Sequence, residues 1–310
     1  MKINMLCLGA VGLGSILLAV AHRQGLFRKH GIDVQLVPVR GTQVPELTPS
    51  NSFGYIGAPA AVMRAAEGAD LRILASFDTA RLSSCLIVNC GITKPEQLRG
   101  KRLGARVVGA AMWIQTVLAL EKLGLQPEQD QISVAEIGDP VDVIRELEAG
   151  RIDGAVLARA QCEQLASKGF SILLDLFPLD MYGAPDALVV TGAFLQDHPD
   201  VTERIVAGLI EGAAFALSPR ERPATLESIK SELMLTDTVA AERGLVELSK
   251  VIARKPYPSI ERLHNMQRVM SLSKPVVSGV VIEDLVDSRF VRKLDENRFI
   301  ERTYAAYGVE

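Results

Sequence analysis

The sequence predicts an α/β protein made of two lobes, and three observations lead to this prediction. The chain has 310 residues, more than a single hydrophobic core usually serves. Short segments patterned like strands alternate with segments patterned like helices, which is typical of βαβ units. Hydrophobic residues make up 48% of the chain, which is enough for a sizeable core in each lobe.

Apolar periodicity places each expected element in turn. Strands are expected at residues 32–39, 53–56, 71–76, 84–89, 103–107, 132–137, 154–157, 171–176 and 187–190. Helices are expected after 57–59 through residue 67 and at 111–123, 141–149 and 161–167, with a short helix and turn at 94–102. This βαβ rhythm predicts mostly parallel sheets covered on both faces. Mainly helices follow residue 190, so we expect a helical wrap that returns to the first lobe.

The first twenty residues resemble a secretory signal, yet we favour a strand, a glycine loop and a helix. Gly9, Gly12 and Gly14 interrupt the apolar run, and it is too short and too broken to span a bilayer. Ser15 is the expected helix cap, and the amphipathic pattern continues over residues 16–27. If the protein is exported, we expect that its signal has already been removed from this chain.

The order of expected strands divides the chain into two lobes. We predict that residues 1–83 and 190–310 form the first lobe, from the N-terminal α/β part and the C-terminal helices. Residues 84–189 form the second α/β lobe. The chain is expected to cross between the lobes near residues 83–89 and 182–190.

Composition and charge exclude several classes of partner. Lys and Arg number 34 against 37 Asp and Glu, for a net charge of -3, so we expect neither nucleic acid nor an anionic membrane surface as a partner. The four cysteines, Cys7, Cys85, Cys90 and Cys162, lack the CxxC spacing of zinc sites and redox motifs. No metal or cofactor is therefore expected.

Seven short segments follow one another in a specific order and spacing. They are GLF at 25–27, HGIDV at 30–34, GAP at 57–59, GADLRI at 68–73, PEQLRGKR at 95–102, LEAGRIDG at 147–154 and IEDLVDSRF at 282–290. In this order they resemble the nitrate/sulfonate/taurine-type family of ABC-importer substrate-binding proteins. That family also includes thiamine-pyrimidine precursor binders and synthases.

The resemblance implies the type II periplasmic-binding-protein fold, with two α/β lobes, a hinge and a central ligand cleft. It also implies the partners, a small-molecule solute and the permease of an ABC transporter, and we expect a monomer. A periplasmic or membrane-anchored extracytoplasmic location follows from the resemblance alone, and a cytoplasmic location stays open. One departure matters: Ala158 and Arg159 stand where family members often carry Glu-Pro, so the family's ligand assignments do not transfer there.

Candidate ligand residues are chosen from strand-to-helix loops and crossing segments. In open α/β sheets, ligands lie beyond the carboxyl ends of the strands, where helix N-termini present free N–H groups and a partial positive charge. The selected residues are Gly12, Gly14, Ser15, Thr42, Ala58, Pro59, Phe77, Asp78, Ser83, Ser84, Arg106, Gly109, Ala110, Ala111, Trp113, Asp139, Arg159 and Asp186.

Several of these residues have a second, purely structural interpretation. Arg106 and Trp113 would hold an anionic head and an apolar body, but they could equally be a surface charge and a core residue. Asp78 could pair with Arg81, and Asp139 could simply cap a helix. Arg159 could meet a carboxylate or sulfonate of the ligand.

A binding protein without chemistry of its own is the leading hypothesis. None of the four histidines lies near a candidate nucleophile, and no Gly-x-Ser-x-Gly elbow is present. The expected ligand is a small organic anion of sulfonate or carboxylate type, with a neutral heterocycle such as a pyrimidine as the rival. A thiamine-pyrimidine precursor binder or a biosynthetic enzyme on the same fold is the alternative, although the cysteine-rich motif of the synthases is missing. A sensory ligand-binding module is a third possibility.

Overall fold

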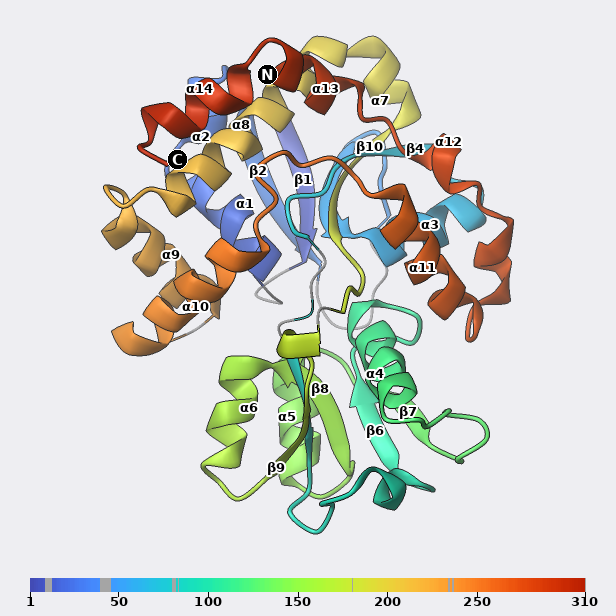
Figure 1. Cartoon of the computed structure of the whole chain (residues 1–310). Coiled ribbons are helices and arrows are strands. Elements are labelled where there is room, and N and C mark those ends of the chain that lie inside the picture. Colours follow the sequence, from blue (N-terminus) through green and yellow to red (C-terminus); the bar gives the residue numbers. More distant parts are fainter. Residues whose placement is uncertain are drawn as a thin grey trace.

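A computed structural model of the chain has two lobes, one above the other in Figure 1. It describes residues 1–8, 13–39, 46–79, 82, 84–179, 181–233, 235 and 237–309. Each lobe is built on a five-stranded sheet, so the predicted two-lobed α/β architecture is confirmed.

The first lobe contains both ends of the chain. Its strands are β1 (Lys2–Leu8), β2 (Asp33–Val39), β3 (Phe53–Gly57), β4 (Leu71–Ala75) and β10 (Asp186–Thr191). Its helices near the N-terminus are α1 (Leu13–Arg23), α2 (Leu26–Lys29) and α3 (Ala58–Ala66). The later helices are α7 (Gly192–Asp197), α8 (Pro199–Leu217), α9 (Arg222–Leu233), α10 (Thr238–Val251), α11 (Ile260–Ser271), η3 (Pro275–Gly279), α12 (Ile282–Leu285), α13 (Arg289–Glu296) and α14 (Phe299–Ala306).

The second lobe is the continuous middle part of the chain. Its strands are β5 (Ser84–Val88), β6 (Arg102–Ala105), β7 (Ser133–Glu136), β8 (Gly154–Ala158) and β9 (Ser171–Asp175). Its helices are η1 (Pro95–Leu98), α4 (Ala111–Lys122), α5 (Pro140–Glu148), α6 (Arg159–Ala166) and η2 (Phe177–Leu179). The expected strands and helices therefore lie within a few residues of the observed ones.

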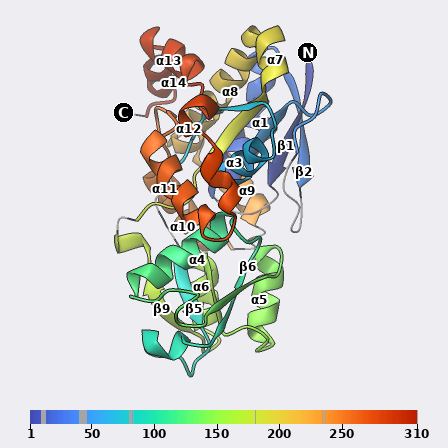
Figure 2. The ribbon, with the colours of Figure 1, turned by 90° about the vertical axis from the view of Figure 1, so that its right-hand side faces the viewer.

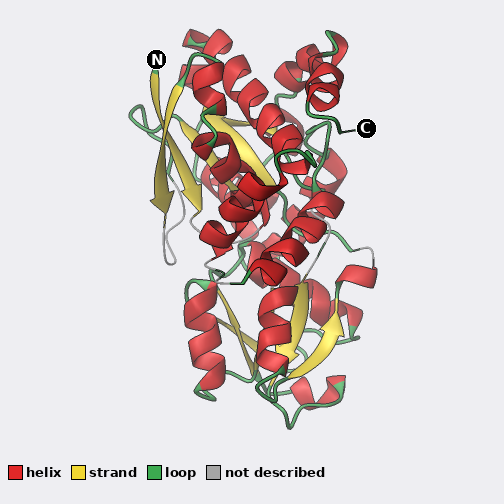
Figure 3. Cartoon of the chain, turned by 90° about the vertical axis from the view of Figure 1, so that its left-hand side faces the viewer, coloured by secondary structure: helices red, strands yellow, loops and turns green. Residues whose placement is uncertain are grey.

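Each sheet is mixed, because one strand runs against the other four. The orders are β2-β1-β3-β10-β4 and β7-β6-β8-β5-β9. Strand β10 is antiparallel to β3 and β4, and β5 is antiparallel to β8 and β9, while the remaining pairs are parallel. These two strands follow the passages of the chain between the lobes, so each enters its sheet from the opposite end. Helices pack against both sheets (Figure 3).

The return of the chain to the first lobe lies earlier than the predicted division at residues 189 and 190. Strand β10 pairs with β3 from Asp186 onward, so that division falls inside a strand of the first sheet. The outward passage ends at Ser84, where β5 begins. The predicted residue boundaries of the two lobes, taken as separate folding units, stay a prediction.

The first helix differs from the sequence prediction at both ends. Helix α1 begins at Leu13, so Ser15 lies inside its first turn and the prediction that Ser15 caps the helix is wrong. The helix also ends at Arg23 instead of continuing to residue 27. Gly25 takes a left-handed backbone conformation with φ of 67° and separates α1 from α2.

The core of the first lobe is organised around α8. Nearly all of this helix is buried, and two of its glycines allow α1 and α2 to lie close to it. A Cβ atom at Gly208 would come within 2.8 Å of the Phe27 ring, and one at Gly212 within 2.8 Å of Ala21. Larger residues at these two positions would force the helices apart.

A second apolar core is shared by the two lobes. Buried side chains of α3 and β4 in the first lobe and of α4 in the second belong to the same cluster, joined by α11. Trp113 of α4 and Met270 of α11 are among its members. Helix α11 stands over α4 in Figures 1 and 2, and Arg268 of α11 lies 3.4 Å from Glu121 of α4. The lobes are therefore packed together along this side.

Glu211 of α8 is a buried carboxylate that joins three helices. It hydrogen-bonds the His30 ring at 2.8 Å, accepts from the Tyr307 hydroxyl at 2.7 Å and forms an ion pair with Lys29. Burial alone would raise its pKa, but these hydrogen bonds lower the pKa to about 2. The charged form of Glu211 therefore stabilises the packing of α2, α8 and α14.

Replacing Glu211 with Gln is expected to destabilise the fold by roughly 3 kcal/mol at pH 7, because a buried pair loses one partner. Since the folded pKa lies below the usual 4.5, this stabilisation is present above pH 4.5 and is lost as the pH falls toward 2. Urea unfolding of both proteins at pH 7 and pH 3 measures the difference. Glu301→Gln, at an exposed pair with Arg298, is the control and should change stability by less than about 1 kcal/mol. An equal loss at both pH values would contradict the assignment.

Candidate functional site

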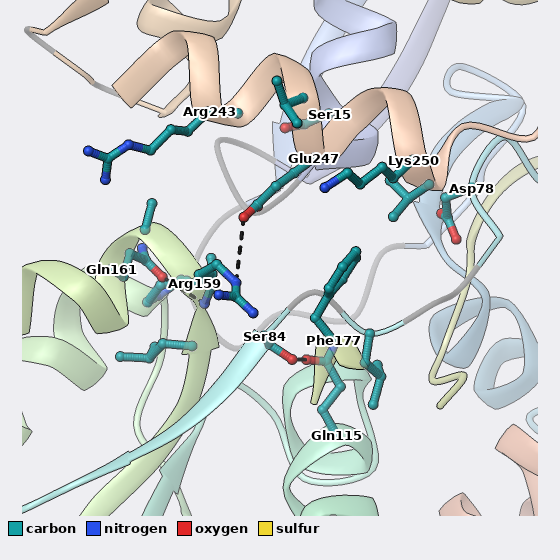
Figure 4. A pocket seen from close by; sticks show the side chains of 18 of the residues that line it. Ser15, Asp78, Ser84, Gln115, Arg159, Gln161, Phe177, Arg243, Glu247 and Lys250 are labelled. Atoms are coloured by element: carbon teal, nitrogen blue, oxygen red, sulfur yellow. Dashed lines mark hydrogen bonds and ion pairs between the residues drawn. The ribbon is translucent and has the colours of Figure 1, made fainter. Parts of the chain in front are cut away.

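A cleft of about 800 Å³ lies between the two lobes. Its upper wall comes from α10 and from the carboxyl end of β3, and its lower wall comes from the end of β8, from α6 and from the start of α4 (Figure 4). A volume of this size is typical of pockets that enclose a small organic molecule.

Several helices begin at the cleft. Ser15 of α1, Ala111 of α4, Pro140 of α5 and Arg159 of α6 are first-turn residues, and all four line the cleft. This follows from the topology, because parallel strands end at the cleft and the next helix starts there. The partial positive charges of helix N-termini favour an anionic group nearby.

Most of the charged side chains of the cleft are paired, and two of the pairs connect the lobes. Arg243 of α10 donates to Glu163 of α6 at 3.0 Å, and Arg159 of α6 lies 3.9 Å from Glu247 of α10 (Figure 4). Arg159 also binds Asp175 within the second lobe. These pairs span the cleft on the side away from the shared core.

An aromatic ring and two exposed valines make part of the cleft apolar. The Phe177 ring lies between charged groups, with the Lys250 ammonium 5.2 Å and the Arg159 guanidinium 5.8 Å from its centroid. Val239 and Val246 of α10 also line the cleft and are 58% and 47% exposed. An apolar ligand body would cover this surface and remove it from water.

Two carboxyl groups and a tyrosine occupy the first-lobe end of the cleft. The backbone N–H of Asp186 donates to the Asp78 carboxylate at 2.8 Å, so the two acidic residues are neighbours. Burial, and then the charge of Asp78, raises the pKa of Asp186 to about 7. Burial, and then Asp186 and Asp78, raises the pKa of Tyr55 well above its usual value. Two carboxyl groups and a tyrosine hydroxyl therefore meet in this part of the cleft.

The second lobe contributes a polar contact of its own. The Ser84 hydroxyl, at the start of β5, donates to the Gln115 side chain of α4 at 2.9 Å (Figure 4). Both residues line the cleft. The amide N–H groups of Gln115 can donate to a ligand.

The structure brings six of the predicted residues together in the cleft, namely Ser15, Asp78, Ser84, Ala111, Arg159 and Asp186. Eight more are described but are not among its lining residues, namely Ala58, Pro59, Phe77, Arg106, Gly109, Ala110, Trp113 and Asp139. Gly14 lies in the first turn of α1, and Gly12, Thr42 and Ser83 lie outside the described residues.

The segment from Arg106 to Trp113 is arranged differently from the expectation. Arg106 is 7% exposed, and its Nε donates to Asp139 at 2.9 Å, so it is neither a surface charge nor a cleft residue. Asp139 occupies the N-cap position of α5, as expected, but its side chain makes no capping hydrogen bond. Trp113 is buried in the shared core, because Met112 and Gln115 form the cleft-facing side of α4. The proposed pairing of Asp78 with Arg81 involves a residue outside the described part.

The contribution of α10 to the cleft was not predicted from the sequence. Arg243, Val246, Glu247 and Lys250 all line the cleft, although their helix was expected only to wrap around the first lobe. Their spacing of three and four residues, together with Val239, forms one stripe along the helix. This stripe of mixed apolar and charged residues was the sequence feature that could have predicted that α10 lines the cleft. Phe177 and Gln115 were also missed.

Within the described ranges, no helix combines the length and the apolar character needed to cross a membrane. The same residues contain no group of three or more His, Cys, Asp or Glu side chains placed to hold a metal ion.

Comparison with known proteins identifies the family. A family model described as "NMT1/THI5 like" matches residues 14–222, which is more than half of the chain. The chain therefore belongs to the NMT1/THI5-like family, and the family resemblance predicted from its sequence segments is confirmed.

Relatives and solved structures extend this comparison. The taurine-binding periplasmic protein of Escherichia coli (strain K12) is 26% identical over 161 residues, or 51% of this chain and 49% of that protein. The chain thus spans about half the length of that curated relative, and 65% of the length of curated binding proteins from Brucella.

Two solved structures share the fold. The alkanesulfonate-binding protein SsuA from Xanthomonas axonopodis pv. citri, solved bound to MOPS, matches with a TM-score of 0.73 and 15% identity, over 93% of this chain and 98% of that one. Desulfurization enzyme DszB matches with a TM-score of 0.64 and 14% identity, over 96% of this chain and 99% of that one. The chain has the type II periplasmic-binding-protein fold, as predicted.

The ion pairs that span the cleft are expected to bias the lobes toward the closed arrangement. Arg243→Glu should open the cleft by repulsion from Glu163, and adding Glu163→Arg should restore closure. Each exposed pair contributes about 0.2–1 kcal/mol, so the open fraction should change by up to about fivefold, and salt should reduce the effect. Intramolecular FRET between dyes on α5 and α9 measures the change.

Arg145→Glu is the matched control, because Arg145 pairs with Asp142 inside α5 and does not reach the other lobe. If Arg145→Glu opens the cleft as far as Arg243→Glu does, the opening reflects net charge and the bridging role is disproved.

Proposed function

We propose that the protein is the solute-binding component of an ABC importer and captures a small organic anion in the cleft between its lobes. The observation that carries the proposal is a cleft of about 800 Å³ lined from both lobes, in a chain of this family. Helix N-termini, a lysine and an apolar surface meet in that cleft, a combination that suits an anionic head on an organic body.

Capture is proposed to work by closure of the lobes. A solute that contacts α10 of the first lobe and α6 or α4 of the second makes its full set of contacts only when the lobes are close. Its higher affinity for that arrangement shifts the population toward the closed form. The permease of the transporter would then recognise the closed form.

Lys250 is the residue of the cleft best suited to attract the anionic head. Arg159, Arg222 and Arg243 already form ion pairs with cleft or neighbouring carboxylates. Lys250 is exposed, and its ammonium lies 5.2 Å from the centroid of the Phe177 ring. A sulfonate or carboxylate next to Lys250 would place its organic part against Phe177 and Val246. The match to the alkanesulfonate-binding protein SsuA, which was solved bound to MOPS, supports a sulfonate as the anionic head.

The proposed location of the protein and a second candidate function both rest on its similarity to known proteins. A place outside the cytoplasm, where importers collect solutes, is proposed because the taurine-binding relative is periplasmic. The second candidate is a thiamine-pyrimidine precursor binder or an enzyme, and the match to DszB, an enzyme with this fold, supports the enzyme. Product formation from a ligand that binds in the cleft would establish the enzyme.

A thermal-shift screen of alkanesulfonates, arylsulfonates, carboxylates, nitrate and thiamine-type pyrimidines tests the proposal. At about 100 times Kd, a ligand specific for the native state adds about 2.7 kcal/mol of stability, which should raise the Tm by about 3 °C or more. Lys250→Ala should weaken binding of the active anion roughly tenfold, because a charged contact is lost.

Lys122→Ala is the control, because Lys122 is an exposed lysine at the end of α4, outside the cleft. It should leave the affinity unchanged. If no compound raises the Tm, or if both lysine variants bind as the unmodified protein does, capture of an anion at Lys250 is wrong.

A further inference from the structure

Two buried cysteines of the second lobe lie against each other, apart from the residues used in solute capture. Cys85 belongs to β5 and Cys162 to α6, and their exposed fractions are 1% and 0%. In this structure both are free thiols. Neither is among the residues that line the cleft, so ligand binding does not account for their position.

The strand and the helix turn both side chains toward the same space. Side chains alternate along β5, so Cys85 and Ile87 face the small apolar cluster of the second lobe, whereas Leu86 belongs to the core that the lobes share. On α6, Cys162 and Leu165 are the buried residues, and their spacing of three places them on one face of the helix. Both of these residues belong to the same small cluster as Cys85.

Hydrogen bonds hold the two sulfur atoms next to each other. The Cys162 thiol donates to the backbone carbonyl of Cys85 at 3.4 Å, and it lies 3.5 Å from the carbonyl oxygen of Leu157. Leu157 is opposite Cys85 where β5 pairs with β8, so both contacts place the helix thiol over the position of Cys85. The two side chains also hydrogen-bond each other, and this bond, together with burial, raises the pKa of Cys162.

The surroundings of the protein decide the state of such a pair. Disulfides form and persist in oxidising compartments outside the cytoplasm, whereas thiols in the cytoplasm are kept reduced. Two thiols already in contact need only a short movement to reach bonding distance. The proposed location outside the cytoplasm therefore favours the oxidised form.

We propose that Cys85 and Cys162 are a disulfide-forming pair, which links α6 covalently to β5 when the protein folds in an oxidising compartment. The inference goes beyond the proposed function and uses only its extracytoplasmic location. The oxidant is a small-molecule disulfide or the disulfide of an oxidase.

The reaction is an exchange of disulfides in two steps. One cysteine thiolate attacks a sulfur of the oxidant, forms a mixed disulfide and displaces one thiolate of the oxidant. The second cysteine thiolate then attacks the mixed disulfide and displaces the other half of the oxidant. The two cysteines lose two electrons and two protons in total, and the oxidant becomes two thiols.

Burial determines when the bond forms. The thiolate is the reacting form, and a raised pKa and nearly complete burial keep it rare in the folded lobe. The link is therefore expected to form while the second lobe is folding. Once the lobe is packed, the same burial protects the link from reductants.

The link lies beside the groups that connect α6 to the other lobe. Arg159 and Glu163, which pair with α10, are within one turn of Cys162. The Cys85 thiol lies 3.8 Å from the Asp175 carboxylate, to which Arg159 is bound. A covalent bond between the two cysteines would hold the start of α6 on its sheet.

Refolding of the full chain from denaturant in a mixture of reduced and oxidised glutathione tests the proposal. Remaining thiols are alkylated with iodoacetamide, and linked peptides are identified by mass spectrometry. A peptide that joins Cys85 to Cys162 is expected. The linked protein should have a Tm about 5 °C or more above that of protein refolded in dithiothreitol, because the two residues are 77 positions apart and the link closes a long loop.

Three variants serve as matched controls. Cys85→Ala and Cys162→Ala should each lose the linked peptide and the difference in Tm between the two refolding conditions. Cys90→Ser, at the exposed cysteine that follows β5, should keep both. If an alanine variant does not fold, the comparison of the unmodified chain with Cys90→Ser still decides, because it separates Cys85 from Cys90 as the partner of Cys162.

The outcomes separate this inference from the proposed function. The absence of a linked peptide, a link that uses Cys7 or Cys90, or an equal Tm in both conditions overturns the proposed pair and leaves solute capture standing. A link between Cys85 and Cys162 with a raised Tm supports the pair, and it does so even if no compound of the thermal-shift screen binds and the proposed function is wrong.

Discussion

The apolar core that α3, α11 and α4 share is the constraint on which the rest of the structure depends. It packs the two lobes together along one side and leaves the opposite side, where α10 faces α6, joined by ion pairs between partly exposed side chains. Surface ion pairs are weak and sensitive to salt, whereas a packed core resists separation. The cleft is therefore expected to open at the α10 side and to pivot at the shared core.

The direction of the strands explains why binding groups collect in this cleft. Because β5 and β10 enter their sheets from the cleft, all other strands end there and the following helices start there. Helix N-termini and Lys250 line this cleft, and the start of β10 places Asp186 beside Asp78 and Tyr55 in the same cleft. One topology thus gathers helix N-termini and the ends of strands in one cleft.

Local patterns were sufficient to predict the fold but only part of the site. Strand ends are local features, so Ser84, Arg159 and Asp186 could be placed near the cleft from the sequence. Arg106 and Trp113 could not, because α4 is apolar on most sides and periodicity does not say which side meets the core. Lys250 could not either, since α10 reaches the cleft by packing on α1 and α9. Such placement depends on contacts between residues far apart in the sequence.

A crystal structure of the protein with the compound that most raises its Tm tests the central claim most directly. The account predicts density for the compound between the lobes, in contact with α10 and with α4 or α6, and with its anionic group near Lys250. Density at another place, such as the groove between α3 and η3 that Val276 and Val281 line, would contradict the account.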